Sequence, residues 1–310
     1  MKILITGGAG YLGSTMSEYF LDNGHEVTVY DNLMYKQCSL LHLFKRPKFK
    51  FIQGDIRDSD FLKLIPQFDF IIPLAAIVGM PACRANPDLA VAVNFTQIKN
   101  IVDNISSSQG IIIPNTNSQY GSSADIITEE SDFKPLSLYA QTKCDAEDIV
   151  AQSGKGIILR LATVFGPSPR MRQDLLVNDF VYKAVTDGYL VLFESHFKRN
   201  YIHVEDIAKT FNFLVDNFDT CKNQIYNVGL SSANLTKLEL AEKIKLFVPG
   251  LVIKQDDFKE DFDKRNYIVS NEKLEKTGWR PTCTLEYGIQ QLIECYSIII
   301  THNNRSFTNL

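Results

Sequence analysis

The sequence carries no excess of either charge. Its 310 residues include 32 lysines and arginines against 36 aspartates and glutamates, which gives a formal net charge of −4. A nucleic-acid partner is not expected, because binding to a phosphate backbone needs clustered positive charge. With 45% hydrophobic and 22% charged residues, the composition is that of a globular chain and excludes disordered or collagen-like ones.

Long apolar runs are also missing. The best apolar runs, Ile71–Met80 and Ile298–Ile300, are far shorter than the ~20 residues that a membrane-spanning helix needs. The apolar start, Ile3–Ile5, runs directly into glycines, so we expect no signal peptide. The six cysteines form no CxxC pair, and no metal-ligand spacing surrounds the five histidines. These absences predict a soluble cytoplasmic protein with free thiols and no metal site.

Strand and helix patterns alternate along the first half of the chain. None of the strands is joined to the next as a hairpin, so the pattern predicts a parallel sheet with right-handed crossovers. The fold class expected is therefore α/β, with a Rossmann-type doubly wound sheet. The predicted strands are Lys2–Thr6, Glu26–Asp31, Phe49–Asp55, Phe68–Ala76, Gly110–Thr116 and Gly156–Phe165. The predicted helices are Tyr11–Asp22, Asp88–Ile105 and Tyr139–Ala151.

The character of the chain changes after Pro167–Pro169. Three helical stretches then alternate with short strands, which predicts a smaller C-terminal α/β lobe that brings the substrate. We expect residues 1–166 to form mainly the main domain and residues 167–310 mainly the lobe, with about 195–230 returning to the main domain. The helices are Asp174–Thr186, Glu205–Phe218 and Thr236–Phe247, and the strands are Leu190–Phe193, Gln224–Val228 and Leu251–Lys254.

A glycine cluster lies between the first strand and the first helix. Gly7, Gly10 and Gly13 stand at the spacing that permits a tight turn, close approach of a pyrophosphate and close helix–strand packing. A plain turn could also contain such glycines, but the strand–turn–helix context favours a dinucleotide site. Asp31 ends the second strand, where a carboxylate binds a ribose 2′-hydroxyl and repels a 2′-phosphate. The pattern therefore predicts NAD as cofactor, although Asp31 could instead cap the strand.

A tyrosine and a lysine stand four residues apart at the start of a predicted helix. Tyr139 and Lys143 therefore project on one face, and the ammonium favours the phenolate, which makes the tyrosine a usable base near neutral pH. A surface Tyr–Lys pair is the alternative. Thr116 ends the strand Gly110–Thr116 at the sheet edge where ligands bind, and its hydroxyl could complete a proton relay. These three residues are the candidate catalytic group.

The motifs together resemble the extended short-chain dehydrogenase/reductase family, which contains nucleotide-sugar epimerases, dehydratases and dehydrogenases. The resemblance extends through RNYIHVEDIA at 199–208, YNVG at 226–229 and LEKTGWRP at 274–281. A subgroup that includes the GDP-heptose 4-dehydrogenases of bacterial capsule synthesis looks more similar still, on the stretches SPRMRQDLLVNDF at 168–180, IIPLAAIVG at 71–79 and PNTNSQYG at 114–121. The motifs in the first half are TGGAGYLG at 6–13, GDIRD at 54–58, NTNSQYG at 115–121, YAQTK at 139–143 and LRLATVFGP at 159–167.

The resemblance implies roles for individual residues. Thr116 and Tyr139 would contact the sugar hydroxyl that is oxidised. The residues implied for the substrate's nucleotide and pyrophosphate are Asn178, Arg199 and Arg265. Arginine suits this role because its planar guanidinium group can bind a phosphate through two hydrogen bonds. The family also implies a homodimer through the helices Asp88–Ile105 and Tyr139–Ala151. The residues implied for NAD are Gly7, Gly10, Tyr11, Leu12, Gly13, Asp31, Asn32, Asp55, Ile56, Leu74, Ala75, Ala76, Tyr139 and Lys143.

The sequence departs from the family pattern at positions that bear on the reaction. Pro73 stands where many relatives have histidine, and Thr163 stands where epimerases often have asparagine. Dehydratases carry an Asp-Glu pair directly after the catalytic threonine, whereas this chain has Asn117 and Ser118, which cannot do that acid–base work near neutral pH. We therefore expect NAD-dependent oxidation of the C4 hydroxyl of a nucleotide sugar, such as GDP-heptose, for surface polysaccharide synthesis. A UDP-sugar 4-epimerase and a non-catalytic NAD(H)-binding protein are the alternatives.

Overall fold

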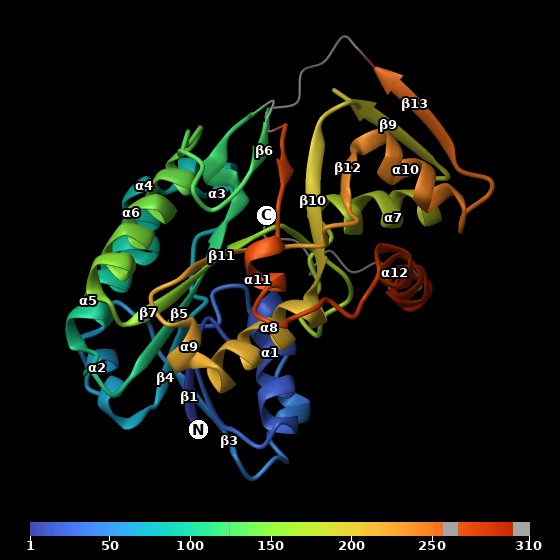
Figure 1. The fold of residues 1–310 in the computed structure, drawn as a ribbon. Coiled ribbons are helices and arrows are strands. Elements are labelled where there is room, and N and C mark those ends of the chain that lie inside the picture. The colour runs from blue at the N-terminus through green and yellow to red at the C-terminus, as the bar shows by residue number, and fades with distance from the viewer. Residues whose placement is uncertain (124, 257–265, 300–310) are drawn as a thin grey trace.

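A seven-stranded sheet forms the centre of the molecule (Figure 1). The computed structural model describes residues 1–123, 125–256 and 266–299. All pairings in this sheet are parallel, and the order β11-β7-β5-β4-β1-β2-β3 reverses direction between β1 and β4. This confirms the doubly wound Rossmann-type fold. Sheets of this kind bind ligands in a crevice where the strand order reverses, which here is at the carboxyl ends of β1 and β4. The strands are β1 (Lys2–Thr6), β2 (Glu26–Asp31), β3 (Phe49–Gln53), β4 (Phe70–Pro73), β5 (Gly110–Thr116), β7 (Gly156–Leu161) and β11 (Ile225–Val228).

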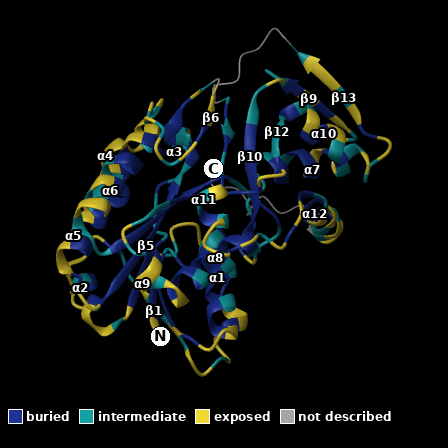
Figure 2. Ribbon diagram, in the orientation of Figure 1, coloured by how far each residue is buried: buried dark blue, intermediate teal, exposed yellow. Residues whose placement is uncertain are grey.

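Helices cover both faces of this sheet, and each face has its own apolar core. Successive side chains of a strand point to opposite faces, so Ile3 and Ile5 lie in one cluster while Leu4 lies in the other. This two-sided burial explains why the strands read as nearly continuous apolar runs. Figure 2 shows the same division, with dark-blue strands inside and exposed residues on the outer helices. The helices are α1 (Tyr11–Asp22) and α8 (Val204–Asp216) on one side, and α4 (Pro87–Val91), α5 (Gln97–Asn104) and α6 (Leu138–Ser153) on the other.

The helix predicted over Asp88–Ile105 is interrupted by a π-helical segment. It runs as α4, a π-helical stretch at Ala92–Thr96 and then α5. Within the π stretch, the buried Asn94 amide accepts from Ile77 N at 2.8 Å and donates to Ile77 O at 3.0 Å. The π-helical segment therefore fixes the backbone at Ile77, in the chain that follows β4. Apolar periodicity alone does not distinguish a π turn from an α turn.

The strand predicted over Gly156–Phe165 is two strands. β7 ends at Leu161 in the main sheet, and β8 (Thr163–Phe165) pairs in parallel with β10 (Lys198–His203) instead. β10 also pairs antiparallel with β12 (Asn234–Thr236), so the chain crosses from one sheet to another at Ala162. Sequence patterns show that both pieces are extended but do not reveal a change of partner.

A separate apolar cluster holds the C-terminal lobe together. It packs α7 (Leu176–Thr186), α10 (Lys237–Lys245) and α12 (Leu285–Ile299) against the parallel pair β9 (Tyr189–Phe193) and β13 (Val252–Asp256). Among the described residues, no helix has the length and apolar character needed to span a bilayer. The remaining short elements are α2 (Ser59–Leu62), α3 (Met80–Ala85), α9 (Phe218–Cys221), α11 (Glu272–Glu275), and the paired strands β6 (Ile126–Ile127) and β14 (Ile268–Val269).

Candidate active site

The glycine turn after β1 has no room for side chains. Gly7 has a φ of 66°, and a Cβ there would lie 2.5 Å from the backbone nitrogen of Ala75. A Cβ on Gly13 would lie 2.4 Å from Gly8 Cα, inside the contact between the turn and α1. The turn therefore depends on glycine at both positions. It also brings Ala75 next to Gly7, as the expected joint role in cofactor binding requires.

The N-terminus of α1 suits an anionic group. Gly10 occupies the N-cap position without a side chain to cap the helix, and the first turn carries no acidic residue. The first N–H groups and the positive end of the helix dipole are thus directed at the turn, as a pyrophosphate requires. Tyr11 points elsewhere: its buried hydroxyl donates to Gly166 O at 2.7 Å, and burial raises its pKa. Leu12 packs partly buried against the core.

Asp31 is tied to the glycine turn by backbone hydrogen bonds. One carboxylate oxygen accepts from Ala9 N at 3.0 Å and the other accepts from Leu33 N at 2.8 Å. The side chain is 7% exposed, and burial raises its pKa. Each oxygen keeps a further lone pair that could accept from a ribose hydroxyl. The strand-end cap and the ribose ligand, posed as alternatives by the sequence, are therefore compatible.

The other expected adenosine contacts lie beside Asp31. Asn32 donates to Asp55 at 3.1 Å, and Asp55 also forms a two-pronged ion pair with Arg57, which lowers the pKa of the Asp55 carboxyl. Ile56 is buried at 8% exposure. Residues Leu74–Ala76 follow β4, and Leu74 N donates to Thr6 O at 2.9 Å. The glycine turn, Asp31 and the end of β4 thus surround the crevice, and their geometry fits a bound dinucleotide.

Thr116, Tyr139 and Lys143 lie on two neighbouring elements. Thr116 ends β5, and its hydroxyl donates to Ser118 Oγ at 2.9 Å while accepting from Ser118 N at 3.1 Å. Tyr139 lies half-buried in the first turn of α6, which Ser137 caps by accepting from Ala140 N. One turn later the buried Lys143 ammonium donates to Pro114 O at 2.9 Å. The pairing of tyrosine and lysine on one helix face is as the sequence predicts.

The position of Lys143 has an electrostatic consequence. Burial of the ammonium lowers its pKa from 10.5 to about 8, because the surrounding protein solvates a charge poorly. Below about pH 8 the ammonium places a positive charge near the first turn of α6, which contains Tyr139. Such a charge favours the phenolate form of a neighbouring tyrosine.

The three residues expected to contact substrate have different surroundings. Asn178 is fully buried, and its amide accepts from Gly166 N at 3.0 Å and donates to Arg172 O at 2.8 Å. Arg199 is buried beneath the ring of Tyr267 and donates to the carbonyl of Lys198. Arg265 lies outside the described residues. Their substrate contacts stay predictions.

A group of potential metal ligands lies at the start of α8. One ligand atom each from His203, Glu205 and Cys283 lie within 4.8 Å of one another. The ammonium of Lys209 is 3.9 Å from the Cys283 sulfur, and the group adjoins the positive N-terminal end of α8. Both features disfavour a cation. His203 is buried and caps α8 by accepting from Glu205 N, which gives it a structural role.

Sequence reasoning missed the charged residues behind the catalytic group. Glu147 and Arg160 are 2% and 3% exposed and form an ion pair at 2.5 Å. A signal was present, since Glu147 follows Lys143 by one helical turn on the same face. Its partner on β7 is distant enough in the sequence that no local pattern connects the two.

The fold and the site define a class: a doubly wound protein with a glycine turn that fits a dinucleotide, and with a tyrosine and a lysine one turn apart on α6. Residues 3–229 match the NAD dependent epimerase/dehydratase family. This chain belongs to that family. The match confirms NAD as the cofactor and shows that the chain is an enzyme of this NAD-dependent class.

Individual relatives span nearly the whole chain. The low-salt glycan biosynthesis protein Agl12 of Haloferax volcanii is 28% identical and covers 96% of this chain and 98% of its own. A putative UDP-glucose 4-epimerase of Methanocaldococcus jannaschii is 26% identical over 98% of this chain and 100% of its own. The crystal structure of UDP-glucuronic acid 4-epimerase from Bacillus cereus, solved with UDP-glucuronic acid and NAD, has the same fold. Its TM-score is 0.83 at 24% identity, with 96% and 100% of the chains covered.

We expect Asp31→Ala to weaken the preference for NAD over NADP, because the substitution removes the carboxylate that repels a 2′-phosphate. Calorimetric affinities for both dinucleotides measure this preference. Asp31→Asn, which keeps the shape and an acceptor but not the charge, separates repulsion from loss of the contacts to Ala9 and Leu33. Equal affinity of the unaltered enzyme for NADP and NAD would refute the assigned role.

Lys143 should make stability depend on pH. Between about pH 8 and 10.5 the unfolded chain keeps the Lys143 proton while the folded chain has lost it. The contribution of Lys143 to the free energy of unfolding therefore rises with pH across this window, by up to roughly 3 kcal/mol. Urea unfolding of the enzyme and of Lys143→Met measures it, with exposed Lys50→Met as control. Parallel pH curves for the enzyme and Lys143→Met would contradict the buried ammonium.

Proposed function

We propose that this enzyme oxidises the C4 hydroxyl of a nucleotide-activated sugar without loss of water. The observation that carries the proposal is the bond from Lys143 of α6 to the Pro114 carbonyl of β5, the strand that ends in Thr116. It brings the helix that carries Tyr139 and Lys143 to this strand, and only β4 separates β5 from β1 and the glycine turn. The substrate class is supported by the relatives, whose names include a glycan biosynthesis protein and UDP-sugar epimerases. The sequence resemblance at residues 168–180 favours a GDP-sugar such as GDP-heptose, for surface polysaccharide synthesis.

Residues of this chain accept and stabilise the proton that leaves the sugar's 4-hydroxyl. Tyr139 as phenolate accepts the proton of the 4-hydroxyl, and the Lys143 ammonium stabilises the phenolate before the transfer. The Thr116 hydroxyl has one hydrogen, now directed at Ser118, that can turn to the substrate oxygen. Bound NAD supplies the hydride acceptor that alcohol oxidation requires. Positioning of the sugar at the carboxyl end of β5, beside the first turn of α6, supplies much of the rate.

Loss of water needs an acid that this site does not provide at the dehydratase positions. Asn117 is 1% exposed and carries an amide, which has no proton to exchange near neutral pH. Ser118 carries a hydroxyl that is already bonded to Thr116. Neither residue can protonate a leaving hydroxyl or remove a C5 proton. The proposed product is therefore a 4-keto sugar that keeps its other hydroxyls.

A UDP-sugar 4-epimerase is the second candidate. The first half-reaction is the same, and the Methanocaldococcus relative carries that name. The two functions differ only in whether the ketone leaves or is reduced on its other face. A non-catalytic NAD(H)-binding role is disfavoured, because both Tyr139 and Lys143 are present and lie on the inner face of α6.

A homodimer is a further part of the proposal. On the helices of the expected interface, Val91 and Leu138 are 38% and 36% exposed, and Phe95 is partly buried. Ile98 and Val102 of α5 belong to the chain's own core. The available apolar surface is thus concentrated near α4 and the start of α6.

Incubation with candidate GDP- and UDP-sugars in deuterated water should yield a 4-keto sugar without deuterium at C5, detected by mass spectrometry and NMR. Tyr139→Phe is the control: its ring still packs but cannot accept a proton, so turnover should vanish while NAD binding remains. A 4-keto-6-deoxy product would refute the assignment. A C4-inverted sugar formed without external oxidant would favour the epimerase instead.

Light scattering at micromolar concentration should report twice the 35.1 kDa mass of one chain. Val91→Glu should shift the population toward monomer, because it places a charge in the apolar contact. Lys99→Gln, on the exposed side of α5, makes the same net-charge change of −1 away from that patch and serves as the control. A monomer for the unaltered protein would remove the dimer from the proposal.

A further inference from the structure

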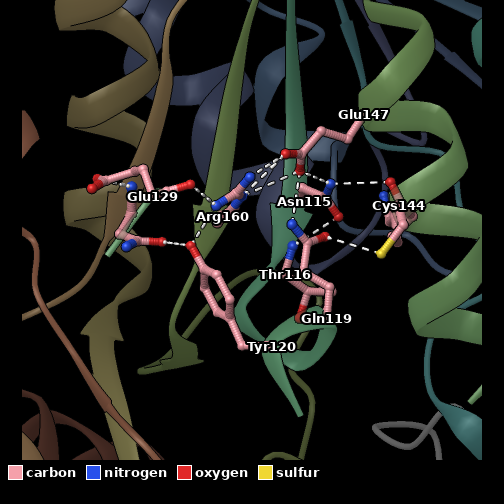
Figure 3. Close-up of polar contacts among 10 residues, drawn as sticks. Asn115, Thr116, Gln119, Tyr120, Glu129, Cys144, Glu147 and Arg160 are labelled. Atoms are coloured by element: carbon pink, nitrogen blue, oxygen red, sulfur yellow. Dashed lines mark hydrogen bonds and ion pairs between the residues drawn. The ribbon is translucent and has the colours of Figure 1, made fainter. Parts of the chain in front are cut away.

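A buried carboxylate lies on the same face of α6 as the Tyr–Lys pair. Glu147 follows Tyr139 by eight residues and Lys143 by four, and its side chain is 2% exposed. It pairs with Arg160 of β7, whose terminal nitrogen is 2.5 Å from Oε1. Figure 3 shows the two side chains meeting between the helix and the strands. The ion pair thus joins α6, one turn after Lys143, to β7.

The second oxygen of Glu147 binds side chains on both sides of Thr116, one at the end of β5 and one in the turn that follows. Oε2 accepts from Asn115 Nδ2 at 2.5 Å and from Gln119 Nε2 at 2.8 Å (Figure 3). Asn115 directly precedes Thr116, and Gln119 follows it within the same turn. Hydrogen bonds to a charged acceptor are stronger than neutral ones. One carboxylate on α6 therefore fixes both sides of the Thr116 backbone.

Asn115 joins the two halves of the catalytic group. Its Nδ2 also donates to the carbonyl of Lys143 at 3.0 Å, and its Oδ1 accepts from Thr116 N at 3.0 Å. A single side-chain amide is thus bonded to the backbones of Thr116 and Lys143 and to the carboxylate of Glu147. Any shift of β5 relative to α6 would break at least one of these bonds.

A second branch of the network leads away from the catalytic group. Arg160 donates to the hydroxyl of Tyr120 at 2.6 Å and to the carbonyl of Glu129 at 2.8 Å. Tyr120 in turn donates to Asn227 Oδ1 at 2.7 Å. Its hydroxyl bonds reach Arg160 and β11, and none of them touches Thr116 or Lys143. Tyr120 therefore offers a control of similar burial within the same network.

Stability alone does not account for this arrangement. A buried ion pair contributes little more than well-packed apolar side chains of the same volume, because both charges lose their hydration. What the charges add is direction, since each bond has a defined partner and angle. We propose that Glu147 and Asn115 are positioning residues that fix the Thr116 hydroxyl relative to Tyr139 and Lys143. This inference rests on the proposed oxidation, in which those three groups act together on one hydroxyl.

The test compares Asn115→Ala with Tyr120→Phe in the full-length enzyme. Steady-state production of NADH from the sugar that the unaltered enzyme oxidises gives kcat and KM, and calorimetry gives the affinity for NAD. Asn115→Ala should lower kcat by roughly 10- to 100-fold, because small displacements of reacting groups cost rates of this order. KM and NAD affinity should stay within about twofold, since the substitution removes no ligand contact. Tyr120→Phe should keep kcat within about twofold even where its melting temperature falls equally.

Gln119→Leu is the second variant, in case Asn115→Ala fails to fold. It removes one bond to Glu147 on the far side of Thr116 and should lower kcat less, by roughly 3- to 10-fold, again with KM unchanged. Equal kcat for Gln119→Leu, Asn115→Ala and Tyr120→Phe, measured below their melting temperatures, would overturn the positioning role. Failure of the proposed function is distinguishable, because then the unaltered enzyme itself produces no NADH from any sugar.

Discussion

The buried ion pair between Glu147 and Arg160 is the interaction on which the arrangement of the site depends. It joins α6 to β7, and through Asn115 it joins both to the end of β5. Loss of one partner of such a pair typically costs about 3–5 kcal/mol, because the other charge stays buried without compensation. The same charges also restrict the side chains to a single geometry, because each hydrogen bond has a defined partner and angle. Catalysis by a proton acceptor needs that geometry, since a phenolate acts only within hydrogen-bond reach.

The sheet topology explains why all the required groups meet at one edge. β1 and β4 are neighbours but their chain connections leave in opposite directions, so a crevice opens at their carboxyl ends. The glycine turn, Asp31 and Leu74–Ala76 occupy one part of this edge, and Thr116 on β5 occupies the next. α6 then brings Tyr139 and Lys143 over the end of β5. The same strand order therefore places the glycine turn and the residues of the proposed proton transfer at one edge.

Local sequence signals predicted much of the fold, because strand and helix patterns depend on residues only a few positions apart. The bounds of β1, β2, β5 and α1 agree with the patterns, and the glycine turn and Tyr–Lys spacing were readable directly. What escaped prediction depends on distant partners. In the π-helical stretch at Ala92–Thr96, a side chain binds the backbone of Ile77. The break at Ala162 allows the next strand to pair with β10, and Glu147 pairs with a residue on another element. The deep burial of Asn178 and Arg199 likewise follows from tertiary packing.

Tyr139 and Thr116 are proposed to act together on the 4-hydroxyl of a nucleotide sugar, held in place by the Asn115–Glu147 link. A crystal structure of Tyr139→Phe with NAD and a GDP-sugar tests this most directly, because the variant holds the substrate without consuming it. We predict that the 4-hydroxyl lies within hydrogen-bond distance of Thr116 Oγ1 and beside the phenyl ring at position 139, with C4 facing the nicotinamide. A sugar bound with another carbon at that position, or with Thr116 turned away from it, would contradict the proposed mechanism.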